Sequence, residues 1–541
     1  MASYNIGLDF GTTNSIVSYL TDNGELEAFP YPAPNGTKYI ASFIAYHQDN
    51  FIEIGSSART TAAYDQSVET YGNFKMRLPL PESEFSQHFQ VNRTPMSVTT
   101  DYLRELLIST ENPYSFVREK GKINNIVVSV PEIWQRDIYN LGRERLQELI
   151  KKELGLEEQL IQLVSEPIAA AAYYTWETQR RAKEQGIETF TGNLLVCDMG
   201  GGTFDISLCR IYGDKKIEVL YFDGQGEKGL EYAGVAFDRG IVQTAYIKKH
   251  GQPLDETSQD FIQLLKEFET VKISSHLQAT KKLTNYLNAP EDKANDEVYK
   301  FSGYTVTLGE VNEVFQSIAQ GINKVIKRVK DNIQLYEWNI DRIFMVGGFC
   351  EFILVQRAIT DALGLTDQGG AYDSRIDKTF NITNSAYAIS YGACLIANGL
   401  VNPTEKFIHT IGIVLETINI YTGERERPEI TLIQGGSNLD TLTQVNLAPQ
   451  EIVPLGDNIA ITLWVQLQSQ GKKHYELLPN MIELPNYSPE SKYRIGMKVD
   501  RSQIAYLAIQ ETRTSKKVEY ELGNLISKMF PGYILNFQTV G

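Results

Sequence analysis

The chain has 541 residues, which is more than one hydrophobic core usually organises, so we expect two or more domains. Hydrophobic residues make up 42% of the chain and charged residues 22%, a balance that is typical of globular proteins and argues against disorder. The formal net charge of −16 disfavours nonspecific binding to nucleic acid and to anionic membranes, because both are negatively charged. Any polyanion that the chain binds therefore needs a local site.

The first residues, MASYN, lead directly into a strand-like run rather than into a basic and then apolar leader segment. No 18 uncharged apolar residues follow one another, so we expect a cytoplasmic protein that does not bind membranes. The cysteines show neither a CxxC spacing nor histidine neighbours suited to a metal, which predicts buried free thiols. These cysteines are Cys197, Cys209, Cys350 and Cys394.

Two distant segments share one pattern. Residues 6–18 read IGLDFGTTNSIVS, and residues 195–207 read LVCDMGGGTFDIS. Each is an apolar strand that ends in Asp, followed by one residue, a turn of Gly and Thr, and a second apolar strand. The pattern predicts a β-hairpin that is used twice, in two related α/β subdomains with a ligand between them.

The residue types in these turns suit phosphate and a divalent cation. Glycines let the backbone approach a ligand closely and direct several N–H groups into one concavity. Asp9 and Asp198 cannot face phosphate without repulsion, so we expect them to share one Mg²⁺, mostly through water. One Gly-rich turn alone is more often an ordinary hairpin turn, but the paired occurrence favours a nucleotide site.

Apolar residues between positions 261 and 271 recur at helical spacing and predict a buried helix face. The segment AYAISYGACLIANG then reads as a helix that ends at Gly399, and Pro403 prevents its continuation, so we place a domain boundary between residues 402 and 403. Beyond it, runs such as 493–499 and 518–522 alternate with period two, which predicts an all-β sandwich in residues 403–541.

IGLDFGTTNS and LLVCDMGGGTFD resemble the two phosphate motifs of the 70-kDa heat-shock chaperones, the DnaK-like branch of the actin-fold ATPases. VVSVPEIWQRD and LVSEPIAAAAYY are similar to the family's connecting segments, GLEYAGVAFDRGI to its Gly-Gly-x-x-Phe-Asp segment, and IFMVGGFCEFILVQRAI to its adenosine motif. Sugar kinases share the hairpins but not this ordered set. The resemblance implies a duplicated actin-like (ribonuclease H-like) ATPase domain in residues 1–402, followed by an all-β sandwich domain.

The resemblance also implies site residues. Lys75 matches the lysine that points at the γ-phosphate, and Glu166 matches the carboxylate near the attacking water; their simpler interpretations are a solvated lysine and a helix start. Together with Asp198 and Thr203, these two residues form the expected catalytic set. The other expected phosphate and Mg²⁺ contacts are Asp9, Gly11, Thr12, Thr13, Asn14, Gly200, Gly201, Gly202 and Asp205.

The adenosine side departs from the family pattern. Ile273 stands where the family has an Arg after the Lys, and Phe349, Cys350 and Glu351 replace its Ser-x-Arg. We therefore expect nucleotide binding with an altered base contact, in which Ile273 or Phe349 supplies apolar surface in place of the arginines. The nucleotide contacts that the resemblance implies on this side are Gly234, Glu269, Lys272, Gly347, Gly348 and Phe349.

Residues 493–522 are similar to the end of the family's peptide-binding β-domain. The residues after them are too few for the helical lid of that domain, and the Leu-rich interdomain linker is missing from residues 400–410. Phe407 and Ile408 are the only apolar contacts in NPTEKFIHT, so we expect weak coupling between nucleotide and peptide binding.

We therefore expect a chaperone-like protein that binds ATP or ADP with Mg²⁺, hydrolyses ATP, and binds polypeptide through its β-domain, with a cochaperone as a candidate partner. The alternative is a nucleotide-gated interaction module with weak or no hydrolysis that binds one folded partner. A third class, the actin-like filament, needs a self-complementary surface that the sequence does not reveal.

Overall fold

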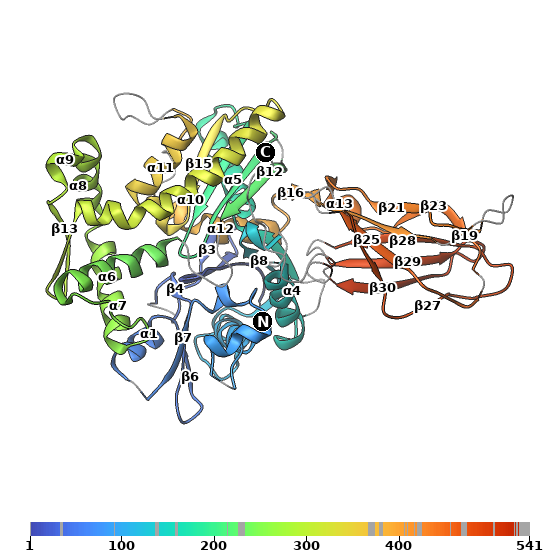
Figure 1. Ribbon diagram of the computed structural model, residues 1–541, viewed down its shortest axis with the longest axis horizontal. Coiled ribbons are helices and arrows are strands. Elements are labelled where there is room, and N and C mark those ends of the chain that lie inside the picture. The colour runs from blue at the N-terminus through green and yellow to red at the C-terminus, as the bar shows by residue number, and fades with distance from the viewer. Residues whose placement is uncertain are drawn as a thin grey trace. The chain divides into compact units, whose positions relative to one another are not determined.

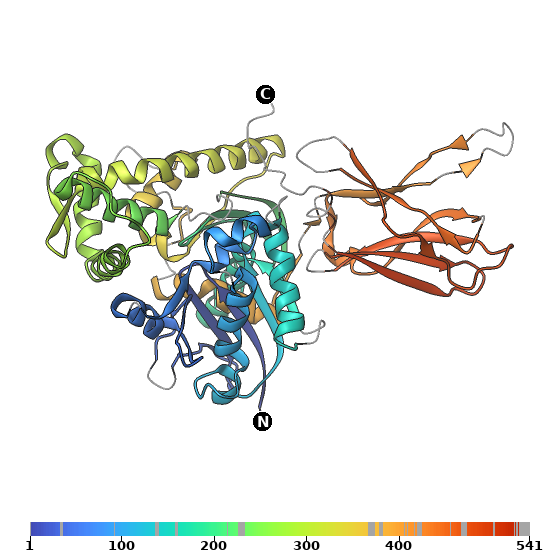
Figure 2. The ribbon, with the colours of Figure 1, turned by 60° about the horizontal axis from the view of Figure 1, so that its bottom comes forward.

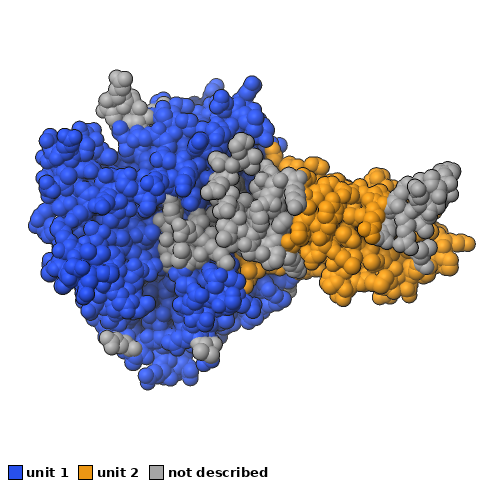
Figure 3. Space-filling model, viewed as in Figure 1, with its two compact units in different colours: residues 1–133, 148–403 blue, residues 134–147, 404–541 orange. Residues whose placement is uncertain are grey.

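The computed structural model divides the chain into two compact units (Figure 3). Unit 1 consists of residues 1–133 and 148–403, and unit 2 of residues 134–147 and 404–541. The structure describes residues 2–32, 36–65, 67–90, 92–135, 140–156, 161–213, 215–225, 233–365, 374–377, 382–404, 406–407, 409–415, 417–418, 425–454, 456–466, 473–500, 504–523, 525 and 529.

The first sheet of unit 1 has the strand order β3-β2-β1-β8-β9, and β4 pairs with β2. β1 and β2 form an antiparallel hairpin, whereas β8 and β9 run parallel to β1 because helical segments connect them. The strands are β1 (Ser3–Phe10), β2 (Asn14–Leu20), β3 (Leu26–Ala28), β4 (Ile40–Ala41), β8 (Lys122–Val130) and β9 (Ile161–Ser165).

The second sheet of unit 1, with the order β15-β10-β11-β12-β16, repeats the centre of the first. β10 and β11 form the hairpin, β12 continues it antiparallel, and β15 runs parallel to β10 as β8 does to β1. The two predicted hairpins are therefore confirmed, and they hold equivalent places in the two sheets. The strands are β10 (Gly192–Met199), β11 (Phe204–Ile211), β12 (Lys216–Gln225), β15 (Arg342–Val346) and β16 (Asn402–Thr404).

Helices α5 (Glu166–Gln185) and α12 (Ile382–Ala397) pack against each other, α12 on strands of the first sheet and α5 on strands of the second (Figure 1). Two glycines permit this close approach. A Cβ at Gly392 would lie 1.7 Å from the carbonyl oxygen of Ala169, and a Cβ at Gly7 would lie 2.2 Å from the nitrogen of Cys394. Any side chain at these positions would push the layers apart.

The remaining elements of unit 1 flank these layers, and Figures 1 and 2 show those before β10 and those after it in different parts of the unit. The helices are α1 (Gly55–Tyr64), α2 (Pro95–Leu103), α3 (Phe116–Glu119), α6 (Gly234–His250), α7 (Gln259–Ser274), α8 (His276–Asn288), α9 (Pro290–Lys293), α10 (Leu308–Leu335) and α11 (Ile353–Leu363). Short helical segments are η1 (Phe74–Arg77), η2 (Glu82–Gln87), η3 (Arg104–Ile108), η4 (Glu132–Gln135), η6 (Leu149–Glu153) and η8 (Gly348–Glu351). One small sheet consists of β5 (Phe43–Tyr46), β6 (Ile52–Ile54) and β7 (Glu69–Gly72). Another consists of β13 (Glu297–Phe301) and β14 (Tyr304–Thr307).

Helix α10 shows how local chemistry and burial act together. Thr307 and Glu310 form a capping box, in which each side chain accepts a hydrogen bond from the backbone N–H of the other residue. Its apolar residues recur on one face and enter a core shared with α6 and β11. In α7, Phe261 and Phe268 of the predicted apolar face are buried in the same core. The other residues of that face, Leu264, Leu265 and Val271, are partly buried against it. All four cysteines are buried free thiols, as predicted.

Unit 2 contains two four-stranded sheets with the orders β21-β18-β25-β26 and β23-β28-β29-β30. Alternate residues of both sheets share one core, so the period-two prediction is confirmed for residues 493–499. Residues 461–467 alternate in the same way: Ile461, Leu463 and Val465 lie in this core, and Leu467 lies outside the described residues. Phe407 packs into this core, and Ile408 also lies outside the described residues. The strands are β18 (Thr410–Val414), β21 (Glu429–Ile433), β23 (Asn446–Ile452), β25 (Thr462–Gln466), β26 (Lys473–Leu477), β28 (Tyr493–Val499), β29 (Ala505–Glu511) and β30 (Lys517–Gly523).

The remaining elements of unit 2 are short. The four-residue helix α13 (Leu439–Leu442) contributes two buried leucines to the core, and helix α4 (Asn140–Glu148) lies almost wholly in residues 134–147. Three small antiparallel pairs complete the described structure of the unit: β17 (Lys406–Phe407) with β22 (Ser437–Asn438), β19 (Thr417–Ile418) with β20 (Arg425–Glu426), and β24 (Asn458–Ile459) with β27 (Ile482–Glu483).

Candidate functional site

The turns of the two hairpins in unit 1 lie against each other. The first turn is Gly11–Thr13 and the second turn is Gly200–Thr203. A Cβ at Gly201 would lie 2.2 Å from the Oγ1 of Thr13, and a Cβ at Gly202 would lie 2.6 Å from the Oγ1 of Thr12. Glycine is therefore required where the turns meet, and the threonine hydroxyls of one turn face the backbone of the other. Asn14, at the start of β2, is exposed.

Each turn is held by hydrogen bonds from a neighbouring segment. Ser42 braces the first turn, because its hydroxyl donates to the carbonyl oxygen of Gly11 (2.7 Å) and its N–H to that of Thr13 (2.9 Å). The start of α6 braces the second turn, because the N–H of Gly234 donates to Gly200 O at 3.1 Å and the next N–H to Gly201 O at 3.0 Å. The predicted residue Gly234 thus lies directly against the second turn.

Gly347 and Gly348 follow strand β15, which runs beside β10. Gly347 has a φ of +83°, and a Cβ there would lie 2.5 Å from the Oδ1 of Asp198, so both its conformation and its surroundings require glycine. A Cβ at Gly348 or at Gly200 would meet no atom within 4 Å. Open space therefore remains beside both glycines.

Lys75 and Glu166 form an ion pair in the interior of unit 1. The Lys75 Nζ lies 2.5 Å from Glu166 Oε1, and the exposed fractions of the two side chains are 2% and 9%. Lys75 comes from η1, and Glu166 is the first residue of α5, where Pro167 also favours a helix start. Lys75 is therefore not a solvated lysine. The helix-start interpretation of Glu166 is confirmed, and Glu166 is also a member of the ion pair.

Asp9 and Asp198, at the ends of β1 and β10, complete this charged centre. Burial and the nearby charge of Glu166 raise the pKa of Asp9 to about 7, against the lowering effects of Lys75 and of a 3.1 Å hydrogen bond from Ser129. Burial, together with Glu166, Asp205 and Asp9, raises the pKa of Asp198 well above its ordinary value. Negative charge exceeds positive charge here, so a cation would stabilise the ionised carboxylates.

The donor set fits a magnesium ion. Within the described ranges, no group of three or more His, Cys, Asp or Glu side chains is arranged to hold a metal by itself. Mg²⁺ commonly takes only one or two carboxylates and completes its shell with water and phosphate oxygens. Asp9 and Asp198 can supply those carboxylates, and their raised pKa values show that the centre favours added positive charge.

On the α7 side of the site, the structure gives Lys272 and Glu269 partners within the protein. The Lys272 Nζ donates to both carboxylate oxygens of Asp238 at 2.6 Å, and Glu269 pairs with Arg59 of α1 at 2.8 Å. Burial raises the pKa of Asp238 to about 6, although Lys272 lowers it. A ligand that uses either residue has to compete with these partners.

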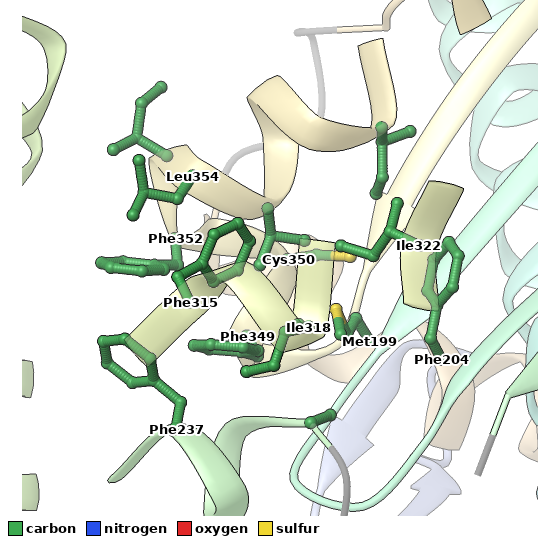
Figure 4. Packing of buried hydrophobic residues seen from close by; sticks show 14 of the residues in the cluster. Met199, Phe204, Phe237, Phe315, Ile318, Ile322, Phe349, Cys350, Phe352 and Leu354 are labelled. Atoms are coloured by element: carbon green, nitrogen blue, oxygen red, sulfur yellow. The ribbon is translucent and has the colours of Figure 1, made fainter. Parts of the chain in front are cut away.

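Phe349 and Ile273, the two expected apolar replacements, lie in opposite environments. Phe349 is 6% exposed, and its ring centroid lies 5.4 Å from that of Phe237 and 5.5 Å from that of Phe352, with which it stacks (Figure 4). Ile273 is 73% exposed. Phe349 therefore already has its apolar contacts in the core, and Ile273 is the side chain with accessible apolar surface.

Several contributors were not found from the sequence. Ser42, Ser129, Arg59 and Asp238 each touch an expected site residue through partners that are distant in the chain. Ser129 and Asp238 have a usable signal. Ser129 lies in the strand of VVSVPEIWQRD, whose parallel register places it opposite Asp9, and Asp238 is the aspartate of the segment GLEYAGVAFDRGI. Arg59 lies in helix α1, whose pattern reveals only its buried face.

Unit 1 is thus a mixed α/β unit with two equivalent hairpins, whose turns lie beside a buried cluster of carboxylates and one lysine. The family model for the Hsp70 protein matches residues 5–371, and the chain belongs to the Hsp70 family.

Similar proteins match about two thirds of the chain. The chaperone protein DnaK of Thermosipho melanesiensis is 24% identical over 371 residues, which is 67% of this chain and 55% of that protein. DnaK of Thermotoga neapolitana is 24% identical over 373 residues (66% and 55%), and that of Cyanidioschyzon merolae is 24% identical over 384 residues (66% and 58%). The chain spans about half the length of the curated relatives it matches. Of the helices that the structure describes, none has the length and hydrophobicity to cross a membrane.

Proposed function

We propose that unit 1 is a duplicated actin-like ATPase domain that binds ATP or ADP with Mg²⁺ at the two hairpin turns and hydrolyses ATP. The observation that carries this proposal is the buried pair of Lys75 and Glu166 beside Asp9 and Asp198. Burying these charges is costly, and isolated buried ion pairs seldom repay their desolvation. The stability of the fold therefore does not explain why these charges are buried together. Binding of phosphate and its cation does explain it.

In this proposal the turns and the charged centre form the phosphate end of the site. Backbone N–H groups of the two turns, with the hydroxyls of Thr12, Thr13 and Thr203, donate to phosphate oxygens. Lys75 directs its positive charge at the γ-phosphate, and Glu166 orients the attacking water. Mg²⁺ bound at Asp9 and Asp198 supplies charge neutralisation of the phosphates when it is present.

Residues Gly234, Glu269, Lys272, Gly347 and Gly348 form the base end of the site. Lys272 and Glu269 reach the ribose by giving up part of their contacts with Asp238 and Arg59. Ile273 offers apolar surface to the base in place of a stacking arginine. We expect the base end to contribute less affinity than the phosphate end.

For unit 2 we propose a β-sandwich that binds polypeptide, so that the whole chain acts as a chaperone-like ATPase. The similar proteins are named chaperone protein DnaK, and unit 2 has two sheets around one core. The packing of Phe407 in the core of unit 2 removes one of the two apolar side chains that could link nucleotide binding to this unit. Weak coupling between the two activities follows from this arrangement.

The test is calorimetric titration of the full chain with ATP and ADP, with and without Mg²⁺, together with single-turnover hydrolysis. Glu166→Gln should still bind Mg·ATP but hydrolyse it at least about ten-fold more slowly, because it leaves the water unoriented. Gln278→Glu, an exposed change on α8, serves as the control and should match the wild type. Failure of the wild type to bind nucleotide would refute the proposal. Binding without hydrolysis would favour a nucleotide-gated interaction module that binds a folded partner.

A further inference from the structure

Strand β26 (Lys473–Leu477) lies at the edge of a sheet in unit 2. Among the described strands it pairs with β25 alone. The residues from His474 to Leu477 are exposed, including Tyr475 at 47% and Leu477 at 60%. Native proteins usually protect such an edge, because its unpaired N–H and C=O groups can pair with another chain. β26 carries no proline and has apolar side chains on one face.

The register shows which backbone groups are directed away from the sheet. Thr462 lies opposite Leu477, and one residue further the N–H of Leu478 donates to the carbonyl oxygen of Ile461 at 2.9 Å. In an antiparallel pair, residues that exchange hydrogen bonds alternate with residues that do not. His474 and Glu476 therefore direct their backbone groups toward β25. The N–H and C=O groups of Tyr475 and Leu477 point to the open side.

The outer face of the sheet holds β26 in place. A Cβ at Gly412 would lie 2.4 Å from the Trp464 ring, so the indole can lie across β18 only because residue 412 is glycine. The Lys473 Nζ lies 4.0 Å from the centroid of this ring and pairs with Glu429, which also accepts a 2.5 Å hydrogen bond from the Tyr475 hydroxyl. These contacts reduce the ordering cost of pairing at the edge.

We propose that β26 pairs with β26 of a second copy of this chain, antiparallel and around a two-fold axis at Tyr475. The strand sequence KHYEL is self-complementary in this register. Tyr475 lies opposite Tyr475 of the second copy, and their outward N–H and C=O groups exchange two hydrogen bonds. His474 lies opposite Glu476 of the second copy, and Lys473 lies opposite Leu477.

Charge complementarity selects this partner and this register. His474 and Glu476 are the pair that does not exchange backbone hydrogen bonds, in which opposite side chains approach most closely. The two-fold axis produces this pair twice, and in each pair the Glu476 carboxylate of one copy faces the His474 imidazole of the other. Because the same patch serves both copies, the contact closes at a dimer and does not propagate into a filament.

The experiment measures the dimer dissociation constant of the full chain by sedimentation velocity over a range of concentrations. His474→Glu places two carboxylates opposite each other and should raise this constant at least about ten-fold. The exchange H474E/E476H restores the opposite pairing and should return it to within about two-fold of the wild type. Gln278→Glu adds the same charge on α8 of unit 1 and should change nothing.

Tyr475→Pro tests the backbone contribution. It removes an N–H that points away from β25, so the sheet keeps its own hydrogen bonds while the edge loses its central donor. Circular dichroism verifies the fold, and the exchange rates of the Tyr475 and Leu477 amides should fall with dimer concentration. A wild type that stays monomeric, or a dimer that survives both His474→Glu and Tyr475→Pro, would overturn the proposal. Protection of these amides only by added unfolded polypeptide would overturn it as well.

Discussion

At the proposed phosphate end of the site, Lys75 and Glu166 are buried and hold each other. At the base end, Lys272 and Glu269 are about one-fifth exposed, and each is paired with a separate protein charge. At the phosphate end, burial together with the excess of carboxylates over cations raises the pKa of Asp9 and of Asp198. At the base end the charges are matched one to one. The phosphate end therefore gains from an added cation, whereas the base end gives up existing contacts to bind a ligand.

The largest expected effect follows from removing the positive charge of Lys75 from the phosphate end. Lys75→Met leaves Glu166 buried without its ion-pair partner and should lower the free energy of unfolding of unit 1 by about 3 to 5 kcal/mol. Hydrogen exchange of the β1 and β10 amides measures this in unit 1 separately from unit 2. Lys281→Met, an exposed change on α8, should have little effect. A loss below about 1 kcal/mol for Lys75→Met would show that Glu166 does not depend on the ion pair with Lys75 for its stability in the interior.

At the base end, the buried carboxyl group of Asp238 should make the stability of the fold depend on pH. The pKa of Asp238 rises from 3.8 to about 6 on folding, so between these values the folded protein binds a proton that the unfolded chain does not. Asp238 therefore destabilises the fold by at most about 3 kcal/mol above pH 6, and this cost disappears as the pH falls toward 4. The wild type should gain stability relative to Asp238→Asn between pH 7 and pH 4.5, as followed by urea unfolding.

Lys272→Met provides the complementary measurement. Lys272 lowers the pKa of Asp238, so its removal should move this pH window upward and widen the difference from Asp238→Asn. A stability difference that does not vary with pH in either background would mean that Asp238 stays ionised throughout.

At the phosphate end the two aspartates should distinguish metal-bound from metal-free nucleotide. Asp9→Asn or Asp198→Asn keeps the size of the side chain but removes a charge that faces the cation. Each should weaken Mg·ATP by about ten-fold, or about 1.4 kcal/mol, and leave metal-free ATP nearly unchanged or slightly tighter. Calorimetric titration with and without Mg²⁺ measures both quantities. An affinity for Mg·ATP equal to that of the wild type in both variants would refute the assignment of the metal to these residues.

The smallest effect is expected where α1 meets α7. Arg59 and Glu269 are each about one-fifth to one-quarter exposed, and such a pair contributes about 0.5 to 1 kcal/mol. Arg59→Ala should therefore slow nucleotide dissociation about two- to five-fold, because Glu269 no longer gives up its contact with Arg59 to reach the nucleotide. Stopped-flow displacement of a fluorescent nucleotide measures the rate, with Arg118→Ala on α3 as the control. A faster release would mean that the contact between Arg59 and Glu269 instead holds the site closed.

The comparison between the two ends also separates local from long-range information. The hairpins were predictable because strand periodicity and the Gly-Thr turns act over about a dozen residues, and the repeat placed Asp9 and Asp198 at equivalent positions. The buried cysteines and the apolar strands of unit 2 were predictable for the same reason, since each lies in an apolar pattern of its own segment.

Only the tertiary structure decided how the charges pair. Lys75 and Glu166 are 91 residues apart, and Arg59 and Glu269 are 210 residues apart, so no local spacing indicates that either pair forms. The aromatic side chain of Phe349 was equally suited to a base or to a core, and the positions of Phe237 and Phe352 placed it in the core. Sequence patterns determine which face of an element is buried, but the energy of a charge depends on which groups from distant elements lie within a few ångströms of it.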